Sequence, residues 1–126
     1  MIRVEDLMIG DLVKFPHGID KVCDLPYVEG KGICASFAAS ATLFPVPVEA
    51  LEPIPLTPEI LMKNHWIGQK GSWLHRHCDF LMCQYEDRTY DLYFDGDKDS
   101  GYITIRFVHE LQHALKLCNI DLEIKV

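Results

Sequence analysis

Three residues late in the sequence have the types and spacing of a zinc-hydrolase motif. His109, Glu110 and His113 spell H-E-x-x-H. In a helix, residues four positions apart share a face, so both imidazoles can bind one zinc ion while the glutamate acts as general base on the metal-bound water. A zinc-dependent hydrolase is therefore one function that the sequence allows.

The surroundings of this motif favour a solvated helix face over a metal site. Extended forms of the motif need Gly and His where this chain has Lys116 and Asn119. On a helical wheel, His109, His113 and Lys116 lie opposite an apolar stripe. We therefore expect these histidines to face solvent and no metal to be bound. The stripe comprises Phe107, Leu111, Ala114, Leu115 and Cys118.

A second group of metal-ligating residue types lies in residues 75–83, which hold two His and two Cys. If this segment is one continuous strand, His75, His77 and Cys83 share a face, because alternate residues of a strand point the same way. The C-x-x-C spacing of structural zinc sites is absent. We expect a half-buried strand whose cysteines pack as small apolar residues, with metal binding by these three side chains as the alternative.

The acidic segment 95–101, DGDKDSG, begins like a calcium-binding loop. Its register then fails, because the sixth position is Ser100 where Gly is needed and the twelfth is Arg106 where Glu is needed. Asp and Gly are common in turns, so we expect a solvated hairpin loop. The sequence contains no nucleophile elbow, phosphate-binding glycine loop or dinucleotide fingerprint, and we assign no catalytic, cofactor-binding or metal-binding residue.

Composition and charge exclude several classes of protein. The chain has 126 residues, 48% of them apolar and 25% charged, which is typical of one globular domain or a domain with a small added lobe. The formal net charge of −7 is spread along the chain and disfavours binding to nucleic acid. No apolar run is long enough for a membrane span. Five cysteines and a start without a secretory signal predict a cytoplasmic protein with free thiols.

The helices and strands expected from the sequence, which must position these residues, divide into two lobes. In residues 1–52, short strands are expected at 9–15, 19–23 and 33–37, with an edge strand around Val46 and Val48. Tight turns between these strands predict a small SH3-like β-barrel lobe.

Residues 53–126 are expected to form an α+β lobe that packs with the first as one structural unit. Thr57 is a helix cap followed by Pro58 and Glu59, and this helix should run to about Gly68. An antiparallel β-meander should follow, then a second helix that stops at Asn119, and a C-terminal strand. The expected ranges are 72–77, 79–85, 90–94 and 102–105 for the meander, 107–118 for the second helix and 121–126 for the last strand.

Three segments resemble a family of small uncharacterised proteins encoded in bacterial prophages and mobile elements. They are IGDLV at 9–13, EPIPLTPEIL at 52–61 followed by Asn64, and VHELQ at 108–112. In that family an opening R-I-G-N-L-V-like strand, a P-I-P-L-T-x-E-x-L segment and a V-H-x-L-Q-N helix follow one another. The family often has Asn where this chain has His113, so the resemblance implies that the second zinc ligand is not a family feature. It implies no activity and no catalytic residue.

The function expected from these observations is a non-enzymatic phage or mobile-element accessory protein, acting as a protein-binding or structural module in the host-cell cytoplasm. Trp66, Trp73, Tyr90 and Tyr93 could line an interface, or else pack in the core. The alternatives are the zinc-dependent hydrolase and a nucleic-acid-binding module that uses the N-terminal barrel. The identity of the partner and the oligomeric state are left open.

Overall fold

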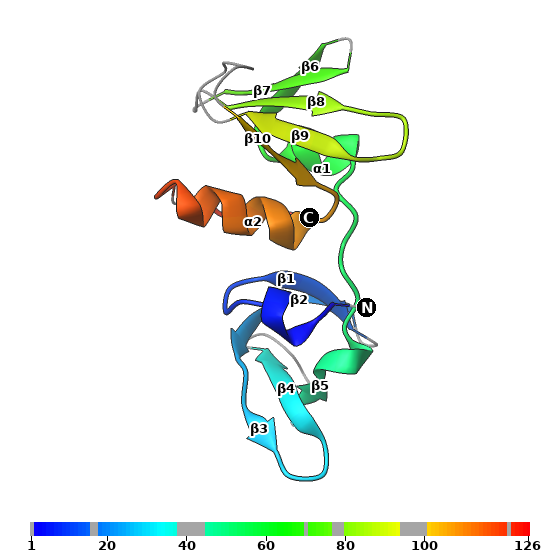
Figure 1. Ribbon diagram of the computed structural model, residues 1–126, viewed down its shortest axis with the longest axis vertical. Coiled ribbons are helices and arrows are strands. Elements are labelled where there is room, and N and C mark those ends of the chain that lie inside the picture. The colour runs from blue at the N-terminus through cyan, green and yellow to red at the C-terminus, as the bar shows by residue number, and fades with distance from the viewer. Residues whose placement is uncertain are drawn as a thin grey trace. The chain divides into compact units, whose positions relative to one another are not determined.

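The computed structural model describes residues 2–15, 18–37, 45–69, 71–76, 80–93, 101–120 and 122–126. The chain forms two compact units, Met1–Ile54 and Pro55–Val126, and each is described here by itself (Figure 1). Each unit contains an antiparallel sheet, and the second also contains two α-helices. The protein is therefore a mostly-β member of the predicted α+β class.

The first unit is a five-stranded sheet with strand order β1-β2-β4-β3, in which β5 pairs with β4. The strands expected at 9–15 and 19–23 are confirmed and form a hairpin, in which β1 and β2 pair from Leu12↔Lys21 to Phe15↔Gly18. The two-residue strand β3 was not expected. The elements are η1 (Val4–Asp6), β1 (Leu12–Phe15), β2 (Gly18–Asp24), β3 (Tyr27–Val28), β4 (Gly32–Phe37), β5 (Val46–Pro47) and η2 (Val48–Ala50).

β1 also pairs with a residue near the end of this unit. The backbones of Lys14 and Glu52 exchange two hydrogen bonds, with N···O distances of 3.0 and 2.8 Å. Lys14 therefore pairs with β2 on one side and with the residue that follows η2 and Leu51 on the other. The described residues of this unit do not form a closed barrel, and residues 38–44, between β4 and β5, lie outside them.

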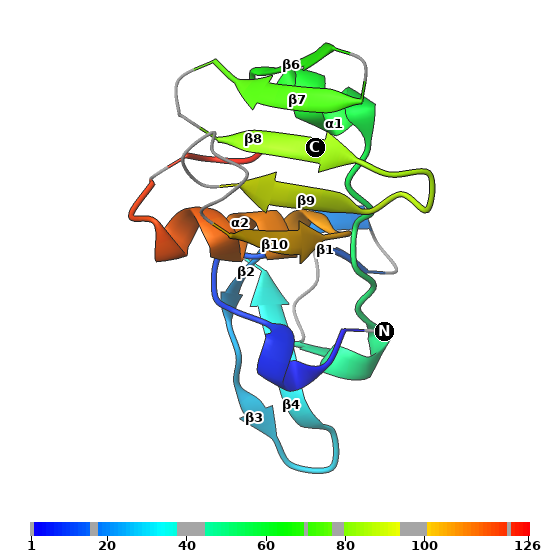
Figure 2. The same cartoon turned by 45° about the horizontal axis from the view of Figure 1, so that its top comes forward.

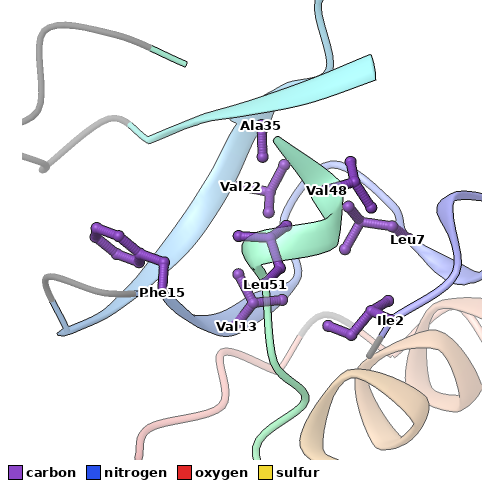
Figure 3. Close-up of a cluster of buried hydrophobic side chains, with 8 residues drawn as sticks. All are labelled: Ile2, Leu7, Val13, Phe15, Val22, Ala35, Val48 and Leu51. Carbon is purple, nitrogen blue, oxygen red and sulfur yellow. The ribbon is translucent and has the colours of Figure 1, made fainter. Parts of the chain in front are cut away.

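The core of the first unit is a cluster of apolar side chains between the sheet and η2 (Figure 3). Four of them are fully buried: Val13, Val22, Ala35 and Leu51. The remaining members are Ile2, Leu7, Phe15 and Val48. Short β-branched side chains from neighbouring strands pack together here, and such side chains are favoured in strands.

The second unit is a five-stranded meander whose strands follow in chain order, β6 to β10, each antiparallel to the next. Both α-helices lie on one side of this sheet, as Figures 1 and 2 show. The elements are α1 (Pro58–Lys63), β6 (Trp66–Gln69), β7 (Ser72–His75), β8 (Leu81–Gln84), β9 (Tyr90–Tyr93), β10 (Tyr102–Ile105) and α2 (Val108–Leu117).

Helix α1 begins where the sequence predicts and ends earlier. The Thr57 hydroxyl accepts a hydrogen bond from the N–H of Ile60 at 3.3 Å, which confirms the cap. The helix ends at Lys63, because His65 adopts a left-handed backbone with φ of 70° and Trp66 starts β6. The expectation that the helix runs to Gly68 is wrong because sheet pairing overrides the local helical pattern.

The C-terminal segment is held by a side chain where we expected a strand. Residues 122–126 belong to no strand. Instead, the buried amide of Asn64 accepts the N–H of Lys125 at 2.7 Å and donates to its carbonyl oxygen at 2.7 Å. The same amide donates to the carbonyl oxygen of Ile60 at 2.7 Å. One side chain therefore pairs with Lys125 as a neighbouring strand would.

A glycine on the edge strand β6 makes room for a buried tryptophan of the neighbouring strand. Gly68 lies directly opposite Trp73 in the pairing of β6 with β7. A Cβ atom at residue 68 would lie 2.8 Å from the indole ring. The indole is 8% exposed, and its Nε1 donates to Oε1 of Gln84 at 3.0 Å. Ring packing over an edge glycine fixes this end of the sheet.

We expect Gly68→Ala to destabilise the second unit by about 1–3 kcal/mol, because the added methyl group overpacks against the indole. The free energy of unfolding from urea denaturation measures the effect. In a double-mutant cycle with Trp73→Leu, the double variant should lose less than the sum of the single changes, because the smaller side chain removes the clash. An unchanged stability of Gly68→Ala would contradict the predicted overpacking.

Candidate functional site

The first histidine of the H-E-x-x-H motif lies in α2 but does not face solvent. His109 is 5% exposed, and its ring stacks on Phe107 with a centroid distance of 6.0 Å. It also makes an edge-on contact with the ring of His113 at 5.6 Å. The expectation of an exposed His109 is therefore wrong, and Cys118, expected in the buried stripe, is exposed. A helical wheel shows which residues share a side of a helix, but it does not show which sides are covered by other parts of the protein.

The glutamate of the motif caps the helix in which it lies. Oε1 of Glu110 accepts hydrogen bonds from the N–H groups of Arg106 at 2.9 Å and Phe107 at 3.0 Å. These two donors lie just ahead of α2, where backbone N–H groups lack partners within the helix. No group of three His, Cys, Asp or Glu side chains in the described part of the chain is placed to hold a metal ion.

Glu110→Ala should lower the free energy of unfolding by about 0.5–2 kcal/mol, because two backbone donors lose their acceptor. Glu110→Gln should stay close to the wild type, since the amide oxygen can accept the same two hydrogen bonds. Urea denaturation of both variants measures the difference. Equal losses in the two variants would show that the negative charge, and not the hydrogen-bonding oxygen, stabilises this helix end.

The second candidate group is divided between the two faces of the sheet. His75 is 8% exposed and contacts Trp66 edge-on at 5.0 Å on the helix side. Cys83 is half-buried and lies on the opposite face, because Leu74 pairs with Leu81 and the residues of each pair share a face. The shared face predicted for His75 and Cys83 is wrong, since the segment is two strands of a hairpin and not one strand. His77, with Cys78 and Asp79, lies outside the described residues.

The acidic segment 95–101 connects two paired strands, as expected. β9 and β10 pair from Tyr93↔Tyr102 to Tyr90↔Ile105. Of this segment, Gly101 belongs to the described residues, and the expected solvated loop at 95–100 lies outside them.

The face of the meander away from α1 and α2 carries a continuous apolar row across all five strands. Each member is paired with the next: Ile67 with Leu74, Leu74 with Leu81, Leu81 with Tyr93, and Tyr93 with Tyr102. Ile67, Leu74 and Tyr102 are 61%, 56% and 58% exposed, whereas Leu81 is half-buried and Tyr93 is 8% exposed. We call these five residues the apolar row and this side of the sheet the open face. Large exposed apolar groups that are contiguous on a surface are typical of binding sites.

A polar row runs beside the apolar row on the same face. Ser72, Cys83, Asp91 and Thr104 are paired in sequence from β7 to β10. The Thr104 hydroxyl donates to Oδ1 of Asp91 at 2.9 Å across β9 and β10. The open face therefore combines a line of apolar contacts with a carboxylate that is held in place.

A shallow groove of about 600 Å³ lies at the β10 end of the two rows. Tyr102, the last member of the apolar row, is part of its lining, together with three carboxylates and one guanidinium group. The lining residues are Tyr85, Glu86, Asp87, Thr89, Asp91, Tyr102, Thr104 and Arg106.

Hydrogen bonds orient the acidic groups of this groove. The hydrogen bond between the side chains of Tyr85 and Asp91, with lesser contributions from burial and nearby negative groups, raises the pKa of Tyr85 to about 12. The Thr89 hydroxyl donates to Oδ1 of Asp87 at 2.6 Å. This hydrogen bond lowers the pKa of Asp87 and keeps its carboxylate ionised.

Tyr85 should therefore ionise about two pH units above the ordinary value of 10. The folded state holds this proton more tightly than the unfolded chain, so the stabilisation is complete below pH 10 and is lost as the pH rises to about 12. Ultraviolet absorbance of the phenolate, as the difference between wild type and Tyr85→Phe, measures the pKa. Asp91→Asn should lower it, and titration of Tyr85 near pH 10 in the wild type would contradict the hydrogen bond.

All four aromatic residues singled out in the sequence are buried, and the exposed tyrosines of the open face were missed. Trp66, Trp73, Tyr90 and Tyr93 are 3%, 8%, 1% and 8% exposed. Tyr85 and Tyr102 are 47% and 58% exposed on the open face. Period-two alternation within each strand separates the faces, but only the register between strands shows which exposed side chains adjoin one another.

The chain matches no protein-family model, no curated protein and no solved structure. No helix in the described ranges is long and apolar enough to cross a membrane. The open face must therefore be interpreted from its own geometry and chemistry.

Proposed function

We propose that the protein is a non-enzymatic protein-binding module and that the open face of the meander is its binding surface. The observation that carries this proposal is the apolar row. Its five members adjoin one another across five strands, and Ile67, Leu74 and Tyr102 are more than half exposed. Burying such side chains against a partner is favourable by roughly 25 cal/mol per Å² of apolar surface removed from water.

The charge of the chain favours a protein over a nucleic acid as the partner. Phosphate backbones are bound through Lys and Arg, whereas this chain carries a formal charge of −7. On the open face, three carboxylates and one guanidinium group line the groove. Both features repel a polyanion, and the apolar row offers the kind of contact that protein interfaces use at their centres.

The proposal includes an SH3-like scaffold for the first unit, and the pairing of its last segment supports this part. The short helix η2 follows β5, and Glu52, two residues after η2, pairs with Lys14 of β1. This connection brings the last segment of the unit back beside its first strand, as in a small barrel. The acidic excess of residues 1–52, eight Asp and Glu against four Lys and Arg, argues against nucleic-acid binding through this unit.

The resemblance of residues 52–61 and 108–112 to prophage and mobile-element proteins supports an accessory role. In the structure the first segment leads into α1 and includes its cap, Thr57. The second segment begins α2 and includes Glu110, which caps that helix. Residues 55–61 and 108–112 are structural elements of the second unit. The resemblance therefore concerns the scaffold that carries the open face.

Differential recovery of partners tests this function. The tagged chain should recover at least one protein from cells that naturally express it, and an Ile67→Ser/Leu74→Ser variant should lose that protein because the apolar row is broken. The control variant is Met62→Ser/Leu117→Ser, which removes two other exposed apolar side chains of the same unit, 60% and 78% exposed.

The control should recover the same protein as the wild type. Circular dichroism should show that all three chains are folded. Recovery of identical proteins by all three chains, or of none by any of them, would refute the proposed binding surface.

A further inference from the structure

The apolar row restricts the backbone conformation of any segment that lies on it. In the interior of a sheet, backbone N–H and C=O groups are paired within the sheet, so the open face presents side chains and no free hydrogen-bonding edge. An extended segment laid across Leu74, Leu81 and Tyr93 would lose water from its own backbone groups without gaining partners. A helix satisfies its backbone internally and presents only side chains to the row.

The length of the row matches a short helix. Five strands are separated by four spacings of about 4.8 Å, so the row from Ile67 to Tyr102 spans about 19 Å. A helix rises about 1.5 Å per residue, and about 13 residues cover this distance. Three to four turns with one apolar stripe are sufficient to span the row and to contact its exposed members.

The negative charge at one end of the row favours a positively charged partner. The groove beside Tyr102 is lined by Glu86, Asp87 and Asp91 against one guanidinium group, that of Arg106. Arg88 lies in the same turn but is not part of the lining. A second copy of the chain would bring the same groove and the same formal charge of −7, whereas a cationic segment would be attracted.

Two exposed tyrosine rings border these carboxylates. Tyr85 and Tyr102 are 47% and 58% exposed and line the same groove as Asp91. An aromatic face attracts the guanidinium or ammonium group of a cationic side chain, and a carboxylate pairs with it. The groove therefore accommodates an Arg or Lys side chain at the end of a helix that covers the row.

We propose that the open face binds a cationic amphipathic helix of a partner protein, with its apolar stripe on the apolar row and an Arg or Lys in the groove. This inference rests on the proposed function and adds to it the chemistry of the partner. It belongs to the helix-on-surface class of peptide recognition, with the sheet face in place of a groove between helices.

Two synthetic peptides of about 13 residues test the proposal. They share one apolar stripe of Leu and differ in the polar positions, which are Arg in one and Glu in the other. Fluorescence anisotropy of labelled peptides with the full chain measures binding at low and high salt. The Arg peptide should bind at least roughly tenfold more tightly than the Glu peptide at low salt, and added salt should reduce this preference.

Matched variants distinguish the effect of the carboxylates on the open face from the effect of the overall negative charge. Glu86→Gln/Asp91→Asn should weaken binding of the Arg peptide roughly fivefold. Glu29→Gln/Glu49→Gln makes the same change in net charge at two exposed positions of the first unit and should have little effect. Ile67→Ser/Leu74→Ser should weaken binding of the Arg peptide at both salt concentrations.

Equal binding of the two peptides, or equal effects of the two charge variants, would overturn the cationic partner. Dimerisation of the wild-type chain that is lost in Ile67→Ser/Leu74→Ser would overturn it as well, because the occupant would then be a second copy. In either case the proposed function stands as long as the Ile67→Ser/Leu74→Ser chain fails to recover the protein that the wild type recovers. If that difference is absent, the proposed function fails too.

Discussion

From β6 to β10 every strand pairs with the next in antiparallel register, and residues directly opposite each other project from the same face. This register places Trp73, Met82 and Leu92 on the helix side, where Met82 and Leu92 are fully buried. The same register places Leu74 and Tyr102 on the other side, in contact with water. A shift of one residue in any strand would exchange the two sets, so the core and the open face are fixed together.

Polar residues complete the ends of this sheet and its helices. Asn64 pairs with Lys125 through its amide, Glu110 accepts two N–H groups ahead of α2, and Thr57 caps α1. Each supplies a hydrogen bond that the regular elements leave unmade at their ends. Glu110 shows why a short motif is weak evidence for catalysis: the residue type that a zinc hydrolase needs as a base is also the type that caps a helix.

The open face combines two kinds of interaction that protein interfaces use. The apolar row provides contact area, and the groove at Tyr102 provides a negative potential with hydrogen-bonded carboxylates. Apolar burial contributes most of the affinity in such interfaces, whereas complementary charge contributes orientation and partner choice. In the proposed function, one sheet face supplies both the contact area and the charge.

The sequence by itself determined the features that depend on neighbouring residues: the Thr57 cap, the strand Tyr102–Ile105 and the left-handed Asn119, whose φ is 56°. Turn chemistry and capping act over a few residues and can be recognised along the chain. Only the tertiary structure decided that His75 and Cys83 lie on opposite faces and that the apolar row is continuous. Both depend on pairing between strands far apart in the sequence, and the buried face that sets the register of this pairing exists only once the strands and helices have packed together.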